Sequence, residues 1–129
     1  MNRWNVELLN NVNGIRFGMD RAEARKIVGT DYTEFKKSKF SKNTTDDFGI
    51  CHIFYDSNDT VEAIEIFGDI EVAIDEQIVF PNGLDNLKKI AEDLVDDGDG
   101  LISIKYSVGV TMDGDRMEGI LFAGQGYYS

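Results

Sequence analysis

The sequence is poor in the residues that cross-link or interrupt small proteins. Its 129 residues include one cysteine, one histidine, one proline and one tryptophan. A single cysteine excludes an intramolecular disulfide framework and is typical of proteins in a reducing compartment. No apolar run approaches the roughly 20 residues that span a bilayer, and the opening MNRWNVELLNN lacks the basic and apolar regions of a secretory signal. We therefore expect a cytoplasmic protein that does not enter a membrane.

Positive charge is scarce in the larger part of the chain. Residues 1–42 contain nine Lys or Arg and five Asp or Glu, whereas residues 43–129 contain four and nineteen. The net charge of −11 disfavours binding to nucleic-acid phosphates and would accelerate association with a basic protein. The alternative is an acidic surface that serves only solubility. Length and composition suit a single domain over residues 1–129.

The hydrophobic pattern predicts both helices and strands. Apolar residues at helical spacing predict three helices, over residues 4–12, 20–28 and 84–95. Alternation and β-branched content predict five strands, over residues 48–55, 61–67, 70–80, 102–111 and 116–123. Asp20 and Glu23 form a capping box for the second helix, and Gly29 ends it. Residues 32–45 are either a strand or an extended loop.

A short internal repeat links the two halves of the chain. SNDTVEAIEIF aligns with DGDRMEGI-LF, and Asp59, Glu62 and Ile64 each recur as the same residue type 56 positions later. Each copy is a hairpin that follows a predicted helix. We therefore expect an α+β fold of two helix-plus-antiparallel-hairpin units, about residues 14–80 and 81–129. They would form a curved, mostly antiparallel sheet with the helices on one face.

Two segments resemble known families. Residues 14–29, GIRFGMDRAEARKIVG, resemble the G-M-[ST]-x-x-[EQ]-[VA]-x-x-[IL]-[LV]-G opening of the tandem domains in the β-lactamase inhibitory protein family and in small lipoproteins of outer-membrane assembly. KNTTDDFG…FYDSNDTVEAIEIF resembles small bacterial immunity proteins encoded beside polymorphic toxins of contact-dependent inhibition systems. The resemblance implies a tandem helix-plus-hairpin fold that binds another protein through its sheet or loops.

The residue types that carry chemistry do not form a catalytic set. Cys51 and His52 are adjacent in a predicted strand, so their side chains should point to opposite faces and cannot act as nucleophile and base. The acidic stretch VDDGDG, residues 95–100, lacks the first and last ligands of an EF-hand loop. Whether it binds a cation stays open. We predict no enzyme activity, no catalytic residue, no cofactor and no metal site.

These observations predict an immunity protein that neutralises a basic toxin domain, a nuclease being one candidate, by occluding its active site or substrate cleft. The alternative is a small ligand-binding or regulatory module with its site in the concave sheet. The predicted contact residues lie in acidic turns and at the C-terminus: Asp46, Asp47, Asp56, Asp59, Asp96, Asp97, Asp99, Asp113, Asp115, Tyr127 and Tyr128. A cluster of lysines, Lys36, Lys37, Lys39 and Lys42, either contacts an acidic surface or forms a solvated face.

Overall fold

The computed structural model of the chain describes residues 2–41 and 43–128. Strands account for 46% of the residues and helices for 12%. The protein is therefore mostly β, and the prediction of an α+β fold with two helix-plus-hairpin units and helices on one face is wrong. In chain order the elements are β1 (Asn2–Glu7), β2 (Asn11–Val12), β3 (Ile15–Arg16), α1 (Arg21–Val28), β4 (Thr33–Phe35), β5 (Thr45–Asp47), β6 (Cys51–Tyr55), β7 (Val61–Ile66), β8 (Ile70–Ile74), β9 (Gln77–Phe80), α2 (Leu84–Ile90), β10 (Val95–Asp96), β11 (Gly100–Ser103), β12 (Val108–Asp113) and β13 (Arg116–Ala123).

The larger of two sheets has the strand order β10-β11-β12-β13-β7-β6-β5-β4. All its neighbouring strands are antiparallel, so it consists of two four-strand meanders that meet where β13 pairs with β7. Ile66 and Ile120 are partners across that junction. Each meander follows one of the two helices along the chain. Each repeated segment therefore belongs to a four-strand meander, whereas the predicted units each contained only a two-strand hairpin.

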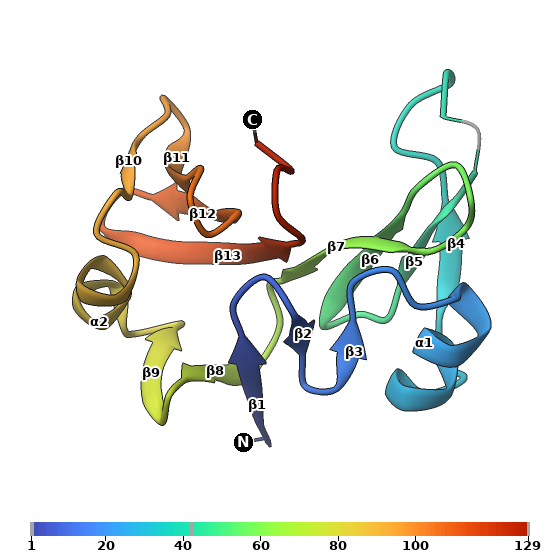
Figure 1. The fold of residues 1–129 in the computed structure, drawn as a ribbon, viewed down its shortest axis with the longest axis horizontal. Helices are drawn as coiled ribbons and strands as arrows, with labels where there is room; N and C mark the ends of the chain where they lie inside the picture. Colours follow the sequence, from blue (N-terminus) through green and yellow to red (C-terminus); the bar gives the residue numbers. More distant parts are fainter. Residues whose placement is uncertain (1, 42, 129) are drawn as a thin grey trace.

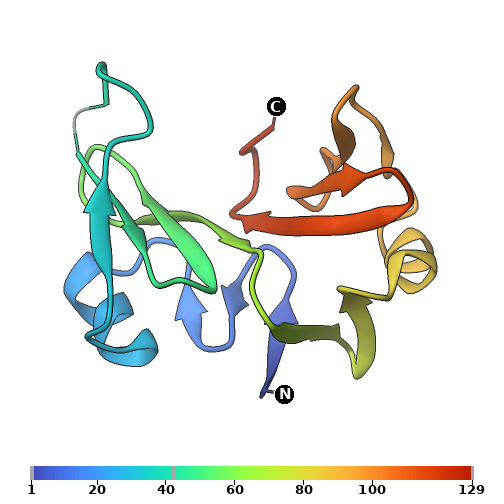
Figure 2. The same cartoon turned by 180° about the vertical axis from the view of Figure 1, so that it is seen from behind.

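The smaller sheet has the order β3-β2-β1-β8-β9, with β1 and β8 parallel. It lies beneath the large sheet, with α1 beside β3 at one end and α2 beside β9 at the other (Figure 1). Figure 2 shows the same arrangement from behind. The C-terminal segment lies on the side of the large sheet that faces away from the small sheet. Apolar side chains of both sheets, such as Val72, Phe80, Ile64 and Phe122, form one buried core between them.

Residues 4–12 form strands rather than the predicted helix. Trp4 and Val6 are buried and alternate with exposed residues. Five residue pairs join β1 to β8, a long-range pairing that outweighs the weak helical spacing. The Asn13–Gly14 pair makes the tight turn between β2 and β3, with φ of 51° and 88°. This turn is typical of a hairpin with positive φ at both central residues.

Two of the predicted long strands are each divided by a turn. Residues 70–80 form β8 and β9, because Asp75 and Glu76 both adopt positive φ, 49° and 67°, and reverse the chain. Residues 102–111 divide into the end of β11, a turn, and most of β12. In that turn Ser107 has a φ of 52°. Left-handed conformations are uncommon outside glycine, so the residue types gave little indication of these turns.

Several other predictions are confirmed at least in part. α1 follows Asp20 and is closed by Gly29 as predicted, but the predicted capping box with Glu23 is wrong, because the Asp20 side chain makes no capping hydrogen bond. The hairpin β6–β7 and the returning strand β13 lie where the pattern placed them. The helix predicted over residues 84–95 is shorter and ends at Ile90. No helix in the described part of the chain is long and apolar enough to cross a membrane.

Candidate functional site

A row of paired residues crosses the face of the large sheet that points away from the core. Each member is the direct cross-strand partner of the next, so their side chains share one face. From β4 to β11 the row is Thr33, Asp47, His52, Glu65, Leu121, Gly109 and Ile102. The strand neighbours Cys51 and Ile66 point into the core instead. The row spans roughly 30 Å along the sheet at the usual strand spacing. We call this surface the open face.

His52 lies between two carboxylates on the open face. Its Nε2 is 3.6 Å from Asp47 Oδ1, and its Nδ1 is 3.8 Å from Glu65 Oε1. The rings of Phe35 and Phe67 pack edge-on against the imidazole, with centroids 4.9 and 4.6 Å away. Phe67 remains 37% exposed. This part of the face therefore presents aromatic surface directly beside negative charge.

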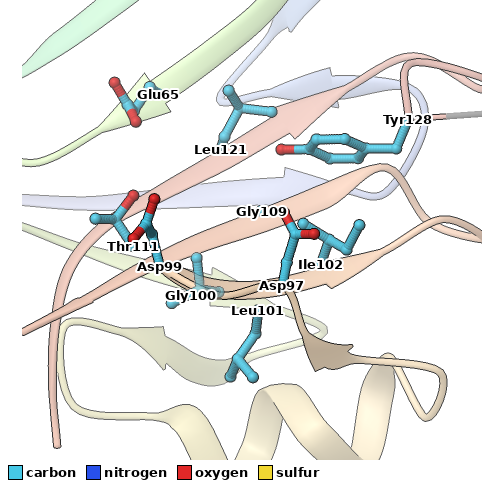
Figure 3. A pocket seen from close by; sticks show the side chains of 11 residues that line it. Glu65, Asp97, Asp99, Gly100, Leu101, Ile102, Gly109, Thr111, Leu121 and Tyr128 are labelled. Atoms are coloured by element: carbon cyan, nitrogen blue, oxygen red, sulfur yellow. The ribbon is translucent and has the colours of Figure 1, made fainter. Parts of the chain in front are cut away.

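A small cavity of about 160 Å³ opens farther along the face, toward β11 and β12. Glu65, Asp97 and Asp99 line it together with Tyr128, which enters from the C-terminal segment (Figure 3). Burial, the neighbouring Tyr127 and the charges of Glu65 and Asp97 raise the pKa of Tyr128 to about 12. The phenol therefore stays protonated at neutral pH and can donate a hydrogen bond.

The C-terminal residues fold back onto the same face. Tyr127 packs against Phe54 and Ala123, and its ring meets that of Tyr128 edge-on at a centroid distance of 5.1 Å. A Cβ added at Gly109 would overlap the Tyr128 hydroxyl. Glycine at this position of the row therefore allows the Tyr128 ring to lie against the sheet.

Asp46 anchors α1 to the large sheet. Its carboxylate is fully buried and accepts hydrogen bonds from Arg25 Nε and Nη2, both at 2.8 Å, and from the Tyr55 hydroxyl at 2.7 Å. Arg21 Nη1 lies 3.5 Å from Oδ1. Burial opposes ionisation of Asp46, but the hydrogen bonds from Arg25 and Tyr55 outweigh it and lower the pKa. Asp46 is therefore not accessible to a partner, contrary to the prediction that it is a contact residue.

Asp56 and Asp59 hold the β6–β7 turn. The Asp56 carboxylate accepts hydrogen bonds from the Thr60 hydroxyl and from the N–H groups of Thr60 and Asn58. Chiefly because of the Thr60 hydroxyl, the pKa of Asp56 is lowered. Asp59 Oδ1 lies 2.7 Å from Arg21 Nη2 and so ties the turn to α1. Both carboxylates are already engaged within the fold.

The other predicted aspartates lie in two turns of the second meander. Asp97 and Asp99 are exposed in the β10–β11 turn and reach the cavity, while Asp96 accepts a backbone hydrogen bond within the same turn. Asp113 and Asp115 lie at the β12–β13 turn, at the end of β13 distant from the C-terminal segment (Figure 1). Neither residue lines the cavity or belongs to the row, although Met112 and Gly114 of this turn border Asp96 and Asp99.

Five of the eleven predicted contact residues thus lie on or beside the open face: Asp47, Asp97, Asp99, Tyr127 and Tyr128. Sequence reasoning missed Glu65, Phe67 and Gly109 as members of this surface. Strand alternation alone could have placed His52 and Glu65 on the face opposite the buried Cys51. The pairing of β7 with β13, which brings Gly109 into the row, leaves no local sequence signal.

Cys51 and His52 lie on opposite faces, as predicted. Cys51 is fully buried in the core, and burial raises the pKa of its thiol to about 12. It therefore cannot form a nucleophile–base pair with His52. Among residues 2–41 and 43–128, no group of three or more His, Cys, Asp or Glu side chains is placed to hold a metal ion.

Comparison of the chain with protein-family models, curated proteins and solved structures gave no match. The geometry and charge of the open face are therefore the basis for assigning a function.

Proposed function

We propose that this protein is an immunity protein that binds a basic toxin domain with its open face and occludes the active site or substrate cleft. The observation that carries the proposal is the unpaired acidity of this surface. In the described part of the chain, Asp47, Glu65, Asp97 and Asp99 form no ion pair with Lys or Arg. Carboxylates that have no cation within the molecule favour a partner that supplies one, and they speed its approach.

Aromatic residues beside these carboxylates also support the proposal. Phe67, Tyr127 and Tyr128 are partly exposed beside the carboxylates, and aromatic side chains dominate the binding energy of many interfaces. The row beneath them is built on strands, which keep the contact groups in fixed positions. Carboxylates spaced along such a face can occupy the sites where a basic nuclease binds phosphates. The resemblance of KNTTDDFG…FYDSNDTVEAIEIF to immunity proteins agrees with this role.

A small-molecule module has weaker support. The cavity beside Tyr128 has a volume of about 160 Å³, whereas pockets for drug-sized ligands usually measure about 300–1,000 Å³. Three carboxylates line it beside the aliphatic side chains of Leu101, Ile102, Val110 and Leu121, so its negative charge would repel anionic ligands. Four other surface hollows measure about 310–400 Å³, but each is open to solvent. We therefore favour a protein partner.

The experiment uses the product of the neighbouring gene, which we expect to contain the toxin domain. Calorimetry measures its affinity for the wild type and for Glu65→Lys and Glu76→Lys, and co-expression tests whether each restores growth. Glu76 is the matched control, because it is exposed in the β8–β9 turn of the small sheet and forms no ion pair among the described residues. We expect Glu65→Lys to weaken binding at least about 10-fold and Glu76→Lys to leave it unchanged. Equal effects, or no binding by the wild type, would contradict the proposal.

A further inference from the structure

The link between β4 and β5 exposes an aromatic side chain almost completely. Phe40 is 83% exposed, more than any other large apolar residue in the described part of the chain. Lys36, Lys37 and Lys39 are exposed around it and form no ion pair, whereas Lys42 lies outside the described residues. Such an exposed aromatic side chain is available to a partner, and aromatic side chains are enriched at protein interfaces.

This segment is ordered by its own hydrogen bonds. The Ser41 N–H donates to the Ser38 carbonyl at 3.1 Å, and the Ser38 N–H donates to Ser41 Oγ at 3.2 Å. Ser38 Oγ also accepts a hydrogen bond from the Phe40 N–H at 3.2 Å. Lys39 Nζ lies 5.2 Å from the Phe40 ring centroid. Because the turn is already formed, less conformational entropy is lost when Phe40 enters a partner.

The same segment borders the open face. Lys37 Nζ lies 4.2 Å from the centroid of Phe54, and Phe54 packs with Tyr127 on that face. Phe54 is on β6, four strands from β11 and the cavity with Asp97 and Asp99. The lysines and Phe40 therefore adjoin the open face near β6, roughly 20 Å along the sheet from Asp97 and Asp99.

We infer that residues 36–41 are the anchor of the same interface, inserting Phe40 into an apolar pocket of the toxin domain whose rim carries carboxylates. This inference rests on the proposed function. Charge complementarity assigns the rim, because Lys36, Lys37 and Lys39 flank Phe40 along the chain and none of them pairs with a carboxylate in the described part of the chain. A metal-dependent nuclease has both halves of the required surface, a basic groove for phosphates and carboxylates around the metal. An anionic membrane fits less well, since it would repel a protein of net charge −11 whose open face borders the loop.

The test measures affinity for the neighbouring-gene toxin domain with Phe40→Ala, Phe40→Trp and Ile27→Ala. Ile27 is the matched control, because it is 45% exposed on α1, away from the open face. We expect Phe40→Ala to weaken binding at least about 10-fold, with Phe40→Trp and Ile27→Ala near wild type. Replacing Lys36, Lys37 and Lys39 by Gln should flatten the dependence of the association rate on salt concentration. Unfolding curves of each variant verify that the fold is intact.

The outcomes separate this inference from the proposed function. If Phe40→Ala binds like the wild type while Glu65→Lys does not, the anchor assignment is overturned and the proposed function stands. If the wild type does not bind the toxin domain, both are overturned. Sedimentation with vesicles of equal parts phosphatidylglycerol and phosphatidylcholine provides a further check. Vesicle binding that requires Phe40 would replace the protein pocket with a lipid surface.

Discussion

The buried carboxylate of Asp46 offers a quantitative test of how α1 is held to the sheet. The Asp46→Asn substitution keeps the shape of the side chain but removes its negative charge. That charge pairs with Arg25 and strengthens the hydrogen bond from the Tyr55 hydroxyl. Removing one partner of a buried ion pair costs about 3–5 kcal/mol, because the other charge stays without a counter-ion. The Arg25 side chain retains 24% exposure, so water can solvate it in part. We therefore expect a loss of about 3 kcal/mol, and a fall in melting temperature on the order of 10 °C.

Asp47→Asn is the matched control, because the adjacent carboxylate lies on the open face with 35% of its side chain exposed. Its substitution should change the free energy of unfolding by no more than about 0.5 kcal/mol. Urea unfolding followed by circular dichroism measures both variants. The pKa of Asp46 is lowered in the folded state, so its stabilisation is present above about pH 4 and is lost as the pH falls through the folded-state pKa. The difference in the free energy of unfolding between the wild type and Asp46→Asn should therefore disappear at acid pH. Equal losses in the two variants, or a difference independent of pH, would refute the ion-pair account.

Two further predictions concern the open face and the core. Gly109→Ala should displace the Tyr128 ring and lower its pKa from about 12 toward the ordinary value of about 10. Ultraviolet titration against Tyr128→Phe measures this, and an unchanged profile would place the ring elsewhere. The Cys51 thiol, buried and with its pKa raised to about 12, should resist a disulfide reagent at neutral pH until denaturant is added. Rapid labelling of the native protein would show that the Cys51 thiol is not buried.

Sequence patterns predicted the elements whose signals are local. α1, the hairpin β6–β7 and β13 each have their own caps, turns or alternation, and each was located. The prediction for β1 was wrong because this strand pairs with β8, which lies more than sixty residues away along the sequence. The turn at Asp75 and Glu76 contains neither Gly nor Pro, so alternation runs through it and resembles one long strand.

The candidate site was predictable to a similar extent. Alternation in a single strand sufficed to separate Cys51 from His52. Membership of the open face depends instead on the register between β7 and β13, which sets Glu65 beside Leu121 and, through β12, brings Gly109 beneath Tyr128. Asp46 and Asp47 show the remaining difficulty. They are identical and adjacent, yet alternation buries one and exposes the other, and composition cannot say which.

The most direct test of the central claim is a map of the bound surface in solution. Amide chemical shifts of the labelled protein, recorded with and without the toxin domain, report which residues meet the partner. We expect the largest changes at His52, Glu65, Tyr128 and residues 36–41, and small ones in β8 and β9. Changes confined to the small sheet, with the open face unaffected, would contradict the central claim.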